Sequence, residues 1–185
     1  MSTHLRIRSL ALAGTALIGV AACSDTAPLQ PELTDPGARH AMAAAAEYNT
    51  VIAQLRSATA RYHDVNAALA DGFVPVGECE VEEGEAPGGI PYANLDWLLD
   101  GMIDPARPDA LLYEPAANGR LTLVGVELAV PYPMWTSAEA PELLGHTFRN
   151  EDGMGVFGLH IWVWRHNPDG MFAWGNPRVS CGDES

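Results

Sequence analysis

The chain has 185 residues, enough for one domain with its own hydrophobic core once an N-terminal segment is set aside. All 10 basic residues are arginine, against 24 acidic residues, so a mature chain without Arg6 and Arg8 carries a net charge of −16. This balance predicts no nucleic-acid partner and disfavours anionic membrane surfaces and highly charged anionic substrates, since binding phosphate needs a basic surface. Cations and neutral molecules remain as ligands.

Residues 1–22 have the pattern of a signal peptide. Two arginines precede an apolar run over residues 10–22, which is too short to serve as a permanent membrane span. The end of this run, Val20-Ala21-Ala22 followed by Cys23, resembles a bacterial lipobox. The resemblance implies that Cys23 is lipidated and becomes the mature N-terminus, attached to a membrane. The alternative is an ordinary secretory peptide with an incidental cysteine.

The residues after the cysteine predict how the domain is attached. Ser24 stands where aspartate would retain a lipoprotein at the inner membrane, so by analogy with lipoprotein sorting the outer membrane is favoured in a cell that has one. Residues 23–37 hold three prolines among polar residues with no apolar period, which predicts an extended tether. We therefore expect a single domain over residues 38–185, held at the periplasmic or extracellular face of the cell envelope.

The first predicted element of the domain is a long helix over residues 38–70, which Asp71-Gly72 ends. Its apolar side chains recur at steps of three and four residues, which places them on one stripe. The members of this stripe are Val51, Leu55, Ala58, Tyr62, Val65 and Leu69.

Three short segments follow the helix. Residues 73–76 predict a short strand, and residues 77–89 predict a loop, because five glutamates surround Cys79 before a Pro-Gly-Gly sequence. The spacing of these glutamates matches no EF-hand, so a solvated acidic face is expected rather than a calcium site. Residues 94–104 have leucines and a methionine at helical spacing, which predicts a short helix.

A strand over residues 111–115, a turn at Asn118-Gly119 and a longer strand over residues 121–130 form a predicted hairpin. In the longer strand the even-numbered residues from Thr122 to Val130 share one β-branched or apolar face. Glu127 lies on the opposite face, and two interpretations stay open. Its carboxylate is either buried with a partner or points into water at a sheet edge. Residues 131–144 are expected to form a loop over the sheet.

The stretch from Gly153 to Cys181 predicts a second hairpin, with a strand over residues 154–165, a turn at 167–170 and a returning strand at 171–174. Because successive strand residues point to opposite sides, the two faces differ in character. Phe157, Leu159, Ile161 and Val163 make an apolar face that we assign to the core. The other face holds His160, Trp162, Trp164 and His166.

Lipidation of Cys23 leaves Cys79 and Cys181 as a pair in an exported protein, where disulfides persist, so we predict a bridge between them. The predicted fold class is α+β, with a long N-terminal helix packed on an antiparallel sheet and one disulfide.

Roughly the C-terminal two-thirds of the mature chain resembles a family of uncharacterised bacterial secreted proteins and lipoproteins. The resemblance rests on residues 107–114, residues 121–127 and residues 160–181, above all His166-Asn167-Pro168 and Asn176-Pro-Arg-Val-Ser-Cys181. The resemblance supports the importance of these positions, but it does not imply a particular reaction. The chain departs from the family pattern at residues 88–91, where Gly-Gly-Ile-Pro replaces a Met-Gly-x-His stretch, and this weakens a metal site built on that histidine.

The candidate ligand-binding residues are His160, Glu127, Trp162, Trp164 and His166. An aromatic face with a few polar groups favours a binding module for a neutral or cationic small molecule. The first alternative is an enzyme that uses Glu127 and His160 as acid and base, with or without a metal. The second is a structural envelope lipoprotein whose tryptophans only pack.

A metal is the one cofactor that these residues suggest. His160 and His166 are roughly 20 Å apart along a continuous strand, too far to share an ion. A metal site therefore needs His160 with Glu127 from another strand, or His166 with His146 or His63.

Overall fold

The computed structural model describes residues 35–79, 81 and 84–182 of the chain. The predicted signal peptide, lipidation site and most of the tether lie outside the described residues. Within the described part, the tether is shorter than predicted, because Pro36 and Gly37 already belong to the first helix. In residues 35–79, 81 and 84–182 no helix combines the length and the apolar character needed to cross a membrane.

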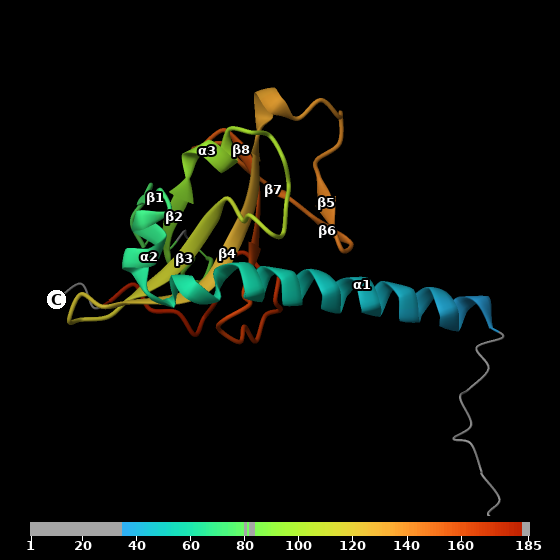
Figure 1. Ribbon diagram of the computed structural model, residues 1–185, viewed down its shortest axis with the longest axis horizontal. Helices are drawn as coiled ribbons and strands as arrows, with labels where there is room; N and C mark the ends of the chain where they lie inside the picture. The colour runs from blue at the N-terminus through green and yellow to red at the C-terminus, as the bar shows by residue number, and fades with distance from the viewer. Residues whose placement is uncertain (1–34, 80, 82–83, 183–185) are drawn as a thin grey trace, which may run out of the picture.

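Helix α1 (Pro36–Thr59) begins after Asp35, and both Asp35 and Pro36 favour the start of a helix. The Asp35 side chain caps it by accepting hydrogen bonds from the backbone N–H groups of Gly37 at 3.1 Å and Ala38 at 3.2 Å. Proline at the first position suits the helix, since its missing N–H would have no partner there. In Figure 1, α1 crosses the sheet with its C-terminal part and extends beyond the sheet with its N-terminal part.

The predicted helix over residues 38–70 is interrupted. After α1 the chain forms the 3₁₀ helix η1 (Ala60–His63), and Asp64 then caps the separate short helix α2 (Val65–Ala70). The buried face is already offset from the predicted stripe inside α1, where Ile52 and Thr59 are buried and Val51 and Ala58 are half-buried. Leu55 is fully buried as expected, but beyond the break Ala68 is buried while Leu69 is 47% exposed.

The strands form a six-stranded sheet in the order β1-β2-β3-β4-β8-β7, with antiparallel neighbours throughout. Together with α1 this sheet confirms the predicted α+β fold. The strand bounds are β1 (Phe73–Pro75), β2 (Ile90–Asn94), β3 (Ala110–Pro115), β4 (Leu121–Pro131), β7 (Arg149–Glu151) and β8 (Val156–Ile161). The short pair β5 (Glu142–Leu143) and β6 (His146–Thr147) and the turns α3 (Leu95–Leu98) and η2 (Tyr132–Met134) complete the described elements.

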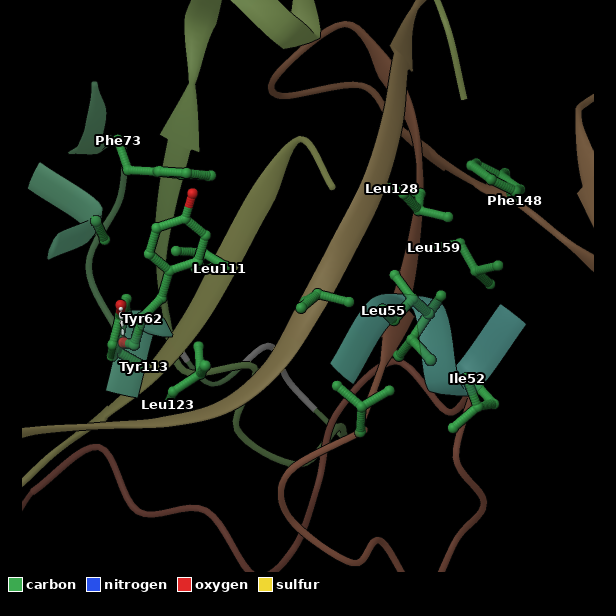
Figure 2. Close-up of a cluster of buried hydrophobic side chains, with 14 residues drawn as sticks. Ile52, Leu55, Tyr62, Phe73, Leu111, Tyr113, Leu123, Leu128, Phe148 and Leu159 are labelled. Atoms are coloured by element: carbon green, nitrogen blue, oxygen red, sulfur yellow. Dashed lines mark hydrogen bonds between the residues drawn. The ribbon is translucent and has the colours of Figure 1, made fainter. Parts of the chain in front are cut away.

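The main core lies between α1 and one face of the sheet (Figure 2). Ile52 and Leu55 come from the helix, and Leu128 and Leu159 come from β4 and β8. The buried phenol of Tyr113 donates a hydrogen bond of 2.6 Å to the Tyr62 carbonyl, which joins β3 to η1. This face of the sheet, which we call the inner face, is therefore occupied by packing, and the opposite outer face is available for a site.

A β-bulge changes which residues of β4 face the core. Leu112 pairs with Gly125 and Tyr113 pairs with Leu123, so Val124 is the extra residue on β4. The predicted alternation therefore holds for Val126 and Leu128 but is wrong at Val124, which packs with Trp162 on the outer face.

The prediction of a C-terminal hairpin is wrong. β8 ends at Ile161, where the N–H of Val163 bonds the Ile161 carbonyl at 2.9 Å, a tight turn that stops the strand. Residues 171–174 are not a strand. The neighbours of β8 are β4 and the short strand β7, which the sequence pattern did not predict.

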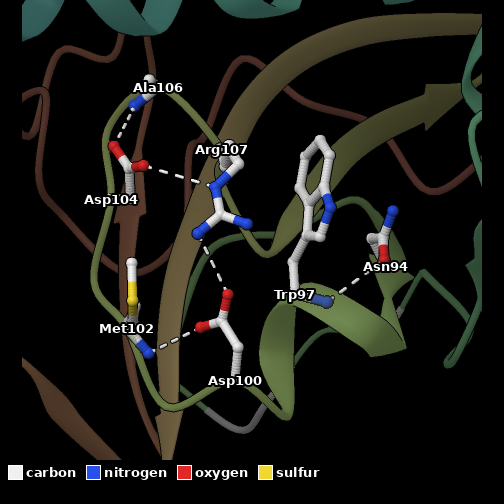
Figure 3. A network of polar contacts seen from close by, with 7 residues as sticks. All are labelled: Asn94, Trp97, Asp100, Met102, Asp104, Ala106 and Arg107. Atoms are coloured by element: carbon white, nitrogen blue, oxygen red, sulfur yellow. Dashed lines mark hydrogen bonds and ion pairs between the residues drawn. The ribbon is translucent and has the colours of Figure 1, made fainter.

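The predicted helix over residues 94–104 is only one turn long. Asn94 caps α3 by accepting a hydrogen bond from the Trp97 N–H at 3.2 Å, and the chain leaves the helix after Leu98. The following loop is held by Arg107, which pairs with Asp100 at 3.0 Å and Asp104 at 3.4 Å (Figure 3). This loop delivers the chain to β3.

The predicted disulfide between Cys79 and Cys181 is confirmed, with Cα atoms 5.2 Å apart. The bridge joins the acidic loop to the C-terminal segment across 102 residues.

Candidate functional site

Four residues form a row across the outer face of the sheet. Ala93 on β2 pairs with Ala110 on β3, Ala110 pairs with Glu127 on β4, and Glu127 pairs with His160 on β8. Directly opposed residues of antiparallel strands point to the same side, so these four side chains are neighbours. The two leading sequence candidates, Glu127 and His160, are thereby brought together. Glu127 is 3% exposed in a central strand, which decides between the two open interpretations in favour of burial with a partner.

Glu127 meets a second carboxyl group from β7. Its side chain shares a hydrogen bond with Glu151 across β8, and its Oε2 lies 3.8 Å from Nε2 of His160. The intervening residue of β8 is Gly158, where an added Cβ would collide with both carboxyl groups. Glycine at this position therefore makes room for the two groups, which we call the carboxyl pair.

The carboxyl pair holds a proton, because two carboxylates cannot hydrogen-bond without one. Burial raises the pKa of Glu127 well above its usual range, and the charge and hydrogen bond of Glu151 raise it further. Nearby, burial raises the pKa of Asp109 to about 7, although its Oδ2 accepts a 2.8 Å hydrogen bond from the Ala129 N–H.

His160 is held in one tautomer. Its Nδ1 lies 2.6 Å from the Trp174 carbonyl oxygen, which only accepts hydrogen bonds, so Nδ1 carries the hydrogen and Nε2 carries the lone pair. Burial lowers the pKa of His160 to about 4, the Trp174 carbonyl opposes this, and the charge of Arg149 lowers it further. The imidazole is therefore neutral near pH 7, and Nε2 is a base beside the carboxyl pair.

Trp174 supplies an aromatic wall. Its ring stacks on His160 with centroids 3.9 Å apart and planes inclined by 8°. The Arg149 guanidinium lies 4.7 Å from the Trp174 ring centroid and forms a 2.7 Å ion pair with Glu85. The C-terminal segment and the acidic loop thus meet over the outer face.

These groups line a pocket of about 120 Å³, which we call the acidic pocket. Its acidic lining residues are Glu78, Glu85, Glu127 and Glu151, and His160, Trp174 and Met154 also contribute. Arg149 on β7 pairs with Glu85, and its charge also acts on His160. The acidic lining residues outnumber this arginine, so the pocket presents proton acceptors and a mainly acidic lining to a ligand.

The other sequence candidates lie elsewhere. Trp162 is on the outer face but is buried against Val124 and Val179, and its Nε1 donates to the Ala173 carbonyl at 2.7 Å. Trp164 turns toward the helix and donates a 3.0 Å hydrogen bond to the Thr59 hydroxyl. His166 is exposed, because the strand ends before it. These three residues serve packing or solvent contact and do not line the acidic pocket.

Glu127 and His160, the first pair suggested for a metal, lie 3.8 Å apart. Of the other suggested histidines, His146 stacks on Phe172 at 3.9 Å, His63 packs against Trp164 and His166 is exposed. Residues 35–79, 81 and 84–182 contain no group of three or more His, Cys, Asp or Glu side chains arranged to hold an ion.

Sequence reasoning missed Glu151, Trp174 and Gly158. Glu151 lies on a three-residue polar strand with no periodic signal, and its contact with Glu127 depends on pairing β7 with β8. Trp174 falls inside the stretch rich in tryptophan, which was the available signal, but the predicted returning strand gave it the wrong neighbours.

Comparison of the chain with protein-family models, with curated proteins and with solved structures found no match. The resemblance to a family of secreted bacterial proteins stays a prediction.

Proposed function

We propose that this protein is a lipid-anchored binding module whose acidic pocket takes a small molecule carrying a positive charge. The observation that carries the proposal is the carboxyl pair: Glu127 and Glu151 both line the acidic pocket and share a hydrogen bond, which requires one proton between them. A protonated amine can replace this proton, because it neutralises the second carboxylate charge and donates the hydrogen bond that the proton supplied.

The remaining groups suit an ammonium ion. Nε2 of His160 is an acceptor beside Glu127, so an ammonium group with three N–H donors finds a third partner there. Trp174 contributes an apolar wall to the pocket, with His160 stacked on its ring and the Arg149 guanidinium 4.7 Å from its ring centroid. A neutral hydroxyl can use the same acceptors at lower affinity, whereas an anion is disfavoured because four glutamates line the pocket and the neighbouring Arg149 pairs with Glu85.

One observation favours a second candidate function, an acid-base enzyme. Oε2 of Glu127, whose pKa is raised by burial, lies 3.8 Å from the lone pair on Nε2 of His160 in one pocket. A substrate between them would receive a proton from Glu127 and lose one to His160. Chemical conversion of a bound ligand, detected as the appearance of a product, would distinguish this function from simple binding.

The binding proposal predicts charge selectivity and a pH dependence in one set of titrations. Calorimetry on the soluble domain should find that butylamine binds more tightly than butanol and that butyrate does not bind. The bound amine displaces the proton of the carboxyl pair, so raising the pH should tighten binding. The Kd for butylamine should fall by up to about tenfold for each unit of rising pH, as long as the pair holds its proton in the free protein. The titrations run from about pH 5 to about pH 8.

Matched variants locate the binding. Glu127→Gln/Glu151→Gln removes the charge of the carboxyl pair and should abolish the preference for butylamine over butanol. Glu139→Gln/Glu142→Gln makes the same two substitutions at exposed positions outside the acidic pocket and should leave this preference unchanged. Butyrate binding as tightly as butylamine, or none of the three probes binding, would contradict the proposal and leave the outer face as a packing surface.

The lipid anchor is the part of the proposal that rests on residues 1–24. Cys23→Ser should release the protein from the membrane fraction or leave the signal segment uncut, because the acyl chains attach through that sulfur. Fractionation and the mass of the mature N-terminus measure this. Ser24→Ala, the control, should stay anchored, and unchanged membrane retention of Cys23→Ser with normal processing would rule the anchor out.

A further inference from the structure

A second cavity adjoins the acidic pocket on the outer face of the sheet. It has a volume of about 210 Å³, and Glu127 and Met154 line both cavities. Apart from Glu127 and Asp109 its lining is apolar. The apolar residues that form it include Ala93, Ala110, Ala129, Leu95, Leu98 and Val156. We call this cavity the tail groove, and it meets the acidic pocket at Glu127.

The tail groove exists because small residues occupy consecutive positions of the transverse row. Starting from Glu127, the next partners across the sheet are Ala110 and then Ala93, both buried. Each side chain ends at Cβ, so a channel remains over two strands where larger residues would fill the space. With neighbouring strands about 4.8 Å apart, the channel runs ~10 Å from Glu127 to Ala93.

Apolar side chains from other elements wall the channel. Asn94 caps α3 and sends Trp97 into the core, which leaves Leu95 and Leu98 on the side of the tail groove. Val76, Leu95 and Met154 are exposed at its edge. Exposed apolar residues grouped around a groove are typical of a ligand site.

We infer that the ligand is an amphiphilic amine, with its ammonium group at the carboxyl pair and an aliphatic tail lying over Ala110 and Ala93. This inference rests on the proposed function and adds the class of molecule. Charge complementarity sets the orientation, because the acidic groups gather at one end and the apolar lining at the other. The one other acidic group of the tail groove, Asp109, is tied to the Ala129 N–H.

A chain-length series tests the tail. Ethylamine, butylamine, hexylamine and octylamine are titrated into the soluble domain at one pH, with octanoate as the anionic control. Each added methylene that enters the groove should tighten binding about fourfold. The gain should stop once the tail exceeds the length of the channel, and octanoate should not bind.

Two variants fill the groove while keeping the carboxyl pair. Ala110→Val and Ala93→Val each place a branched side chain, common in strands, into the channel. The gain per methylene should be lost in both, while in Ala93→Val, two strands away from Glu127, ethylamine should keep its wild-type Kd within about twofold. Ala117→Val makes the same change in an exposed turn and should retain the full chain-length dependence. A thermal melt of each variant checks that it is folded.

The outcomes separate this inference from the proposed function. If octylamine binds no more tightly than ethylamine in the wild type, the tail groove is not a ligand site, although amine binding at the carboxyl pair stands. If the groove variants fold and still gain fourfold per methylene, the tail lies elsewhere and the inference is wrong. If no amine binds, the proposed function itself fails.

Discussion

Replacing Cys79 and Cys181 by serine should lower the free energy of unfolding of the soluble domain by about 4 to 5 kcal/mol. The bridge closes a loop between residues 102 apart, and in the chain-entropy treatment the gain from a cross-link grows with the length of that loop. Urea denaturation of the wild type and the double serine variant, both lacking Cys23, measures the difference.

Reduction supplies the control for this result. A reducing agent should destabilise the wild-type domain by the same amount and leave the double serine variant unchanged. Thiol titration of unfolded, unreduced domain should detect no free sulfhydryl. Two free thiols in freshly exported protein would show that the bridge does not form in the cell.

Leu55→Ala should cost about 3 to 4 kcal/mol of stability, and Leu69→Ala less than about 1 kcal/mol. Both leucines belong to the apolar stripe read from the sequence, but Leu55 is fully buried between α1 and the sheet while Leu69 is 47% exposed (Figure 2). Truncating Leu55 leaves a cavity in a packed core, whereas truncating Leu69 removes atoms that already contact solvent.

The pair serves as its own control, since the chemical change is identical. Urea denaturation measures the two losses of stability. They are read from the shift in the denaturation midpoint, provided that the dependence of the unfolding free energy on urea concentration is the same in both variants. Equal losses for the two variants would mean that the helix continues through Asp64 without a break and buries Leu69.

The sequence by itself determined the elements whose signals are local. The steps of three and four residues predict the helix, and the β-branched runs predict β3, β4 and the first part of β8. Alternation placed Glu127 and His160 away from the apolar face, because side-chain direction has a period of two in any strand. The disulfide followed from the compartment and from the small number of cysteines.

The tertiary structure decided everything that depends on which strands are neighbours. β2 contains Pro91 and β7 has three polar residues, so neither has a strand signal of its own. Each is a strand because of the partner beside it, since pairing and burial outweigh weak local propensity. The contact between Glu127 and Glu151 required both the place of β7 and the glycine at position 158.

Two local irregularities also had no sequence signal. The bulge at Val124 and the turn after Ile161 each change the phase of a strand, and one residue of phase moves every later side chain to the other face. Trp162 therefore packs on the outer face and Trp164 on the helix, although a continuous strand would have placed them together. The sequence named the two central residues of the site, and only long-range strand pairing supplied their partners.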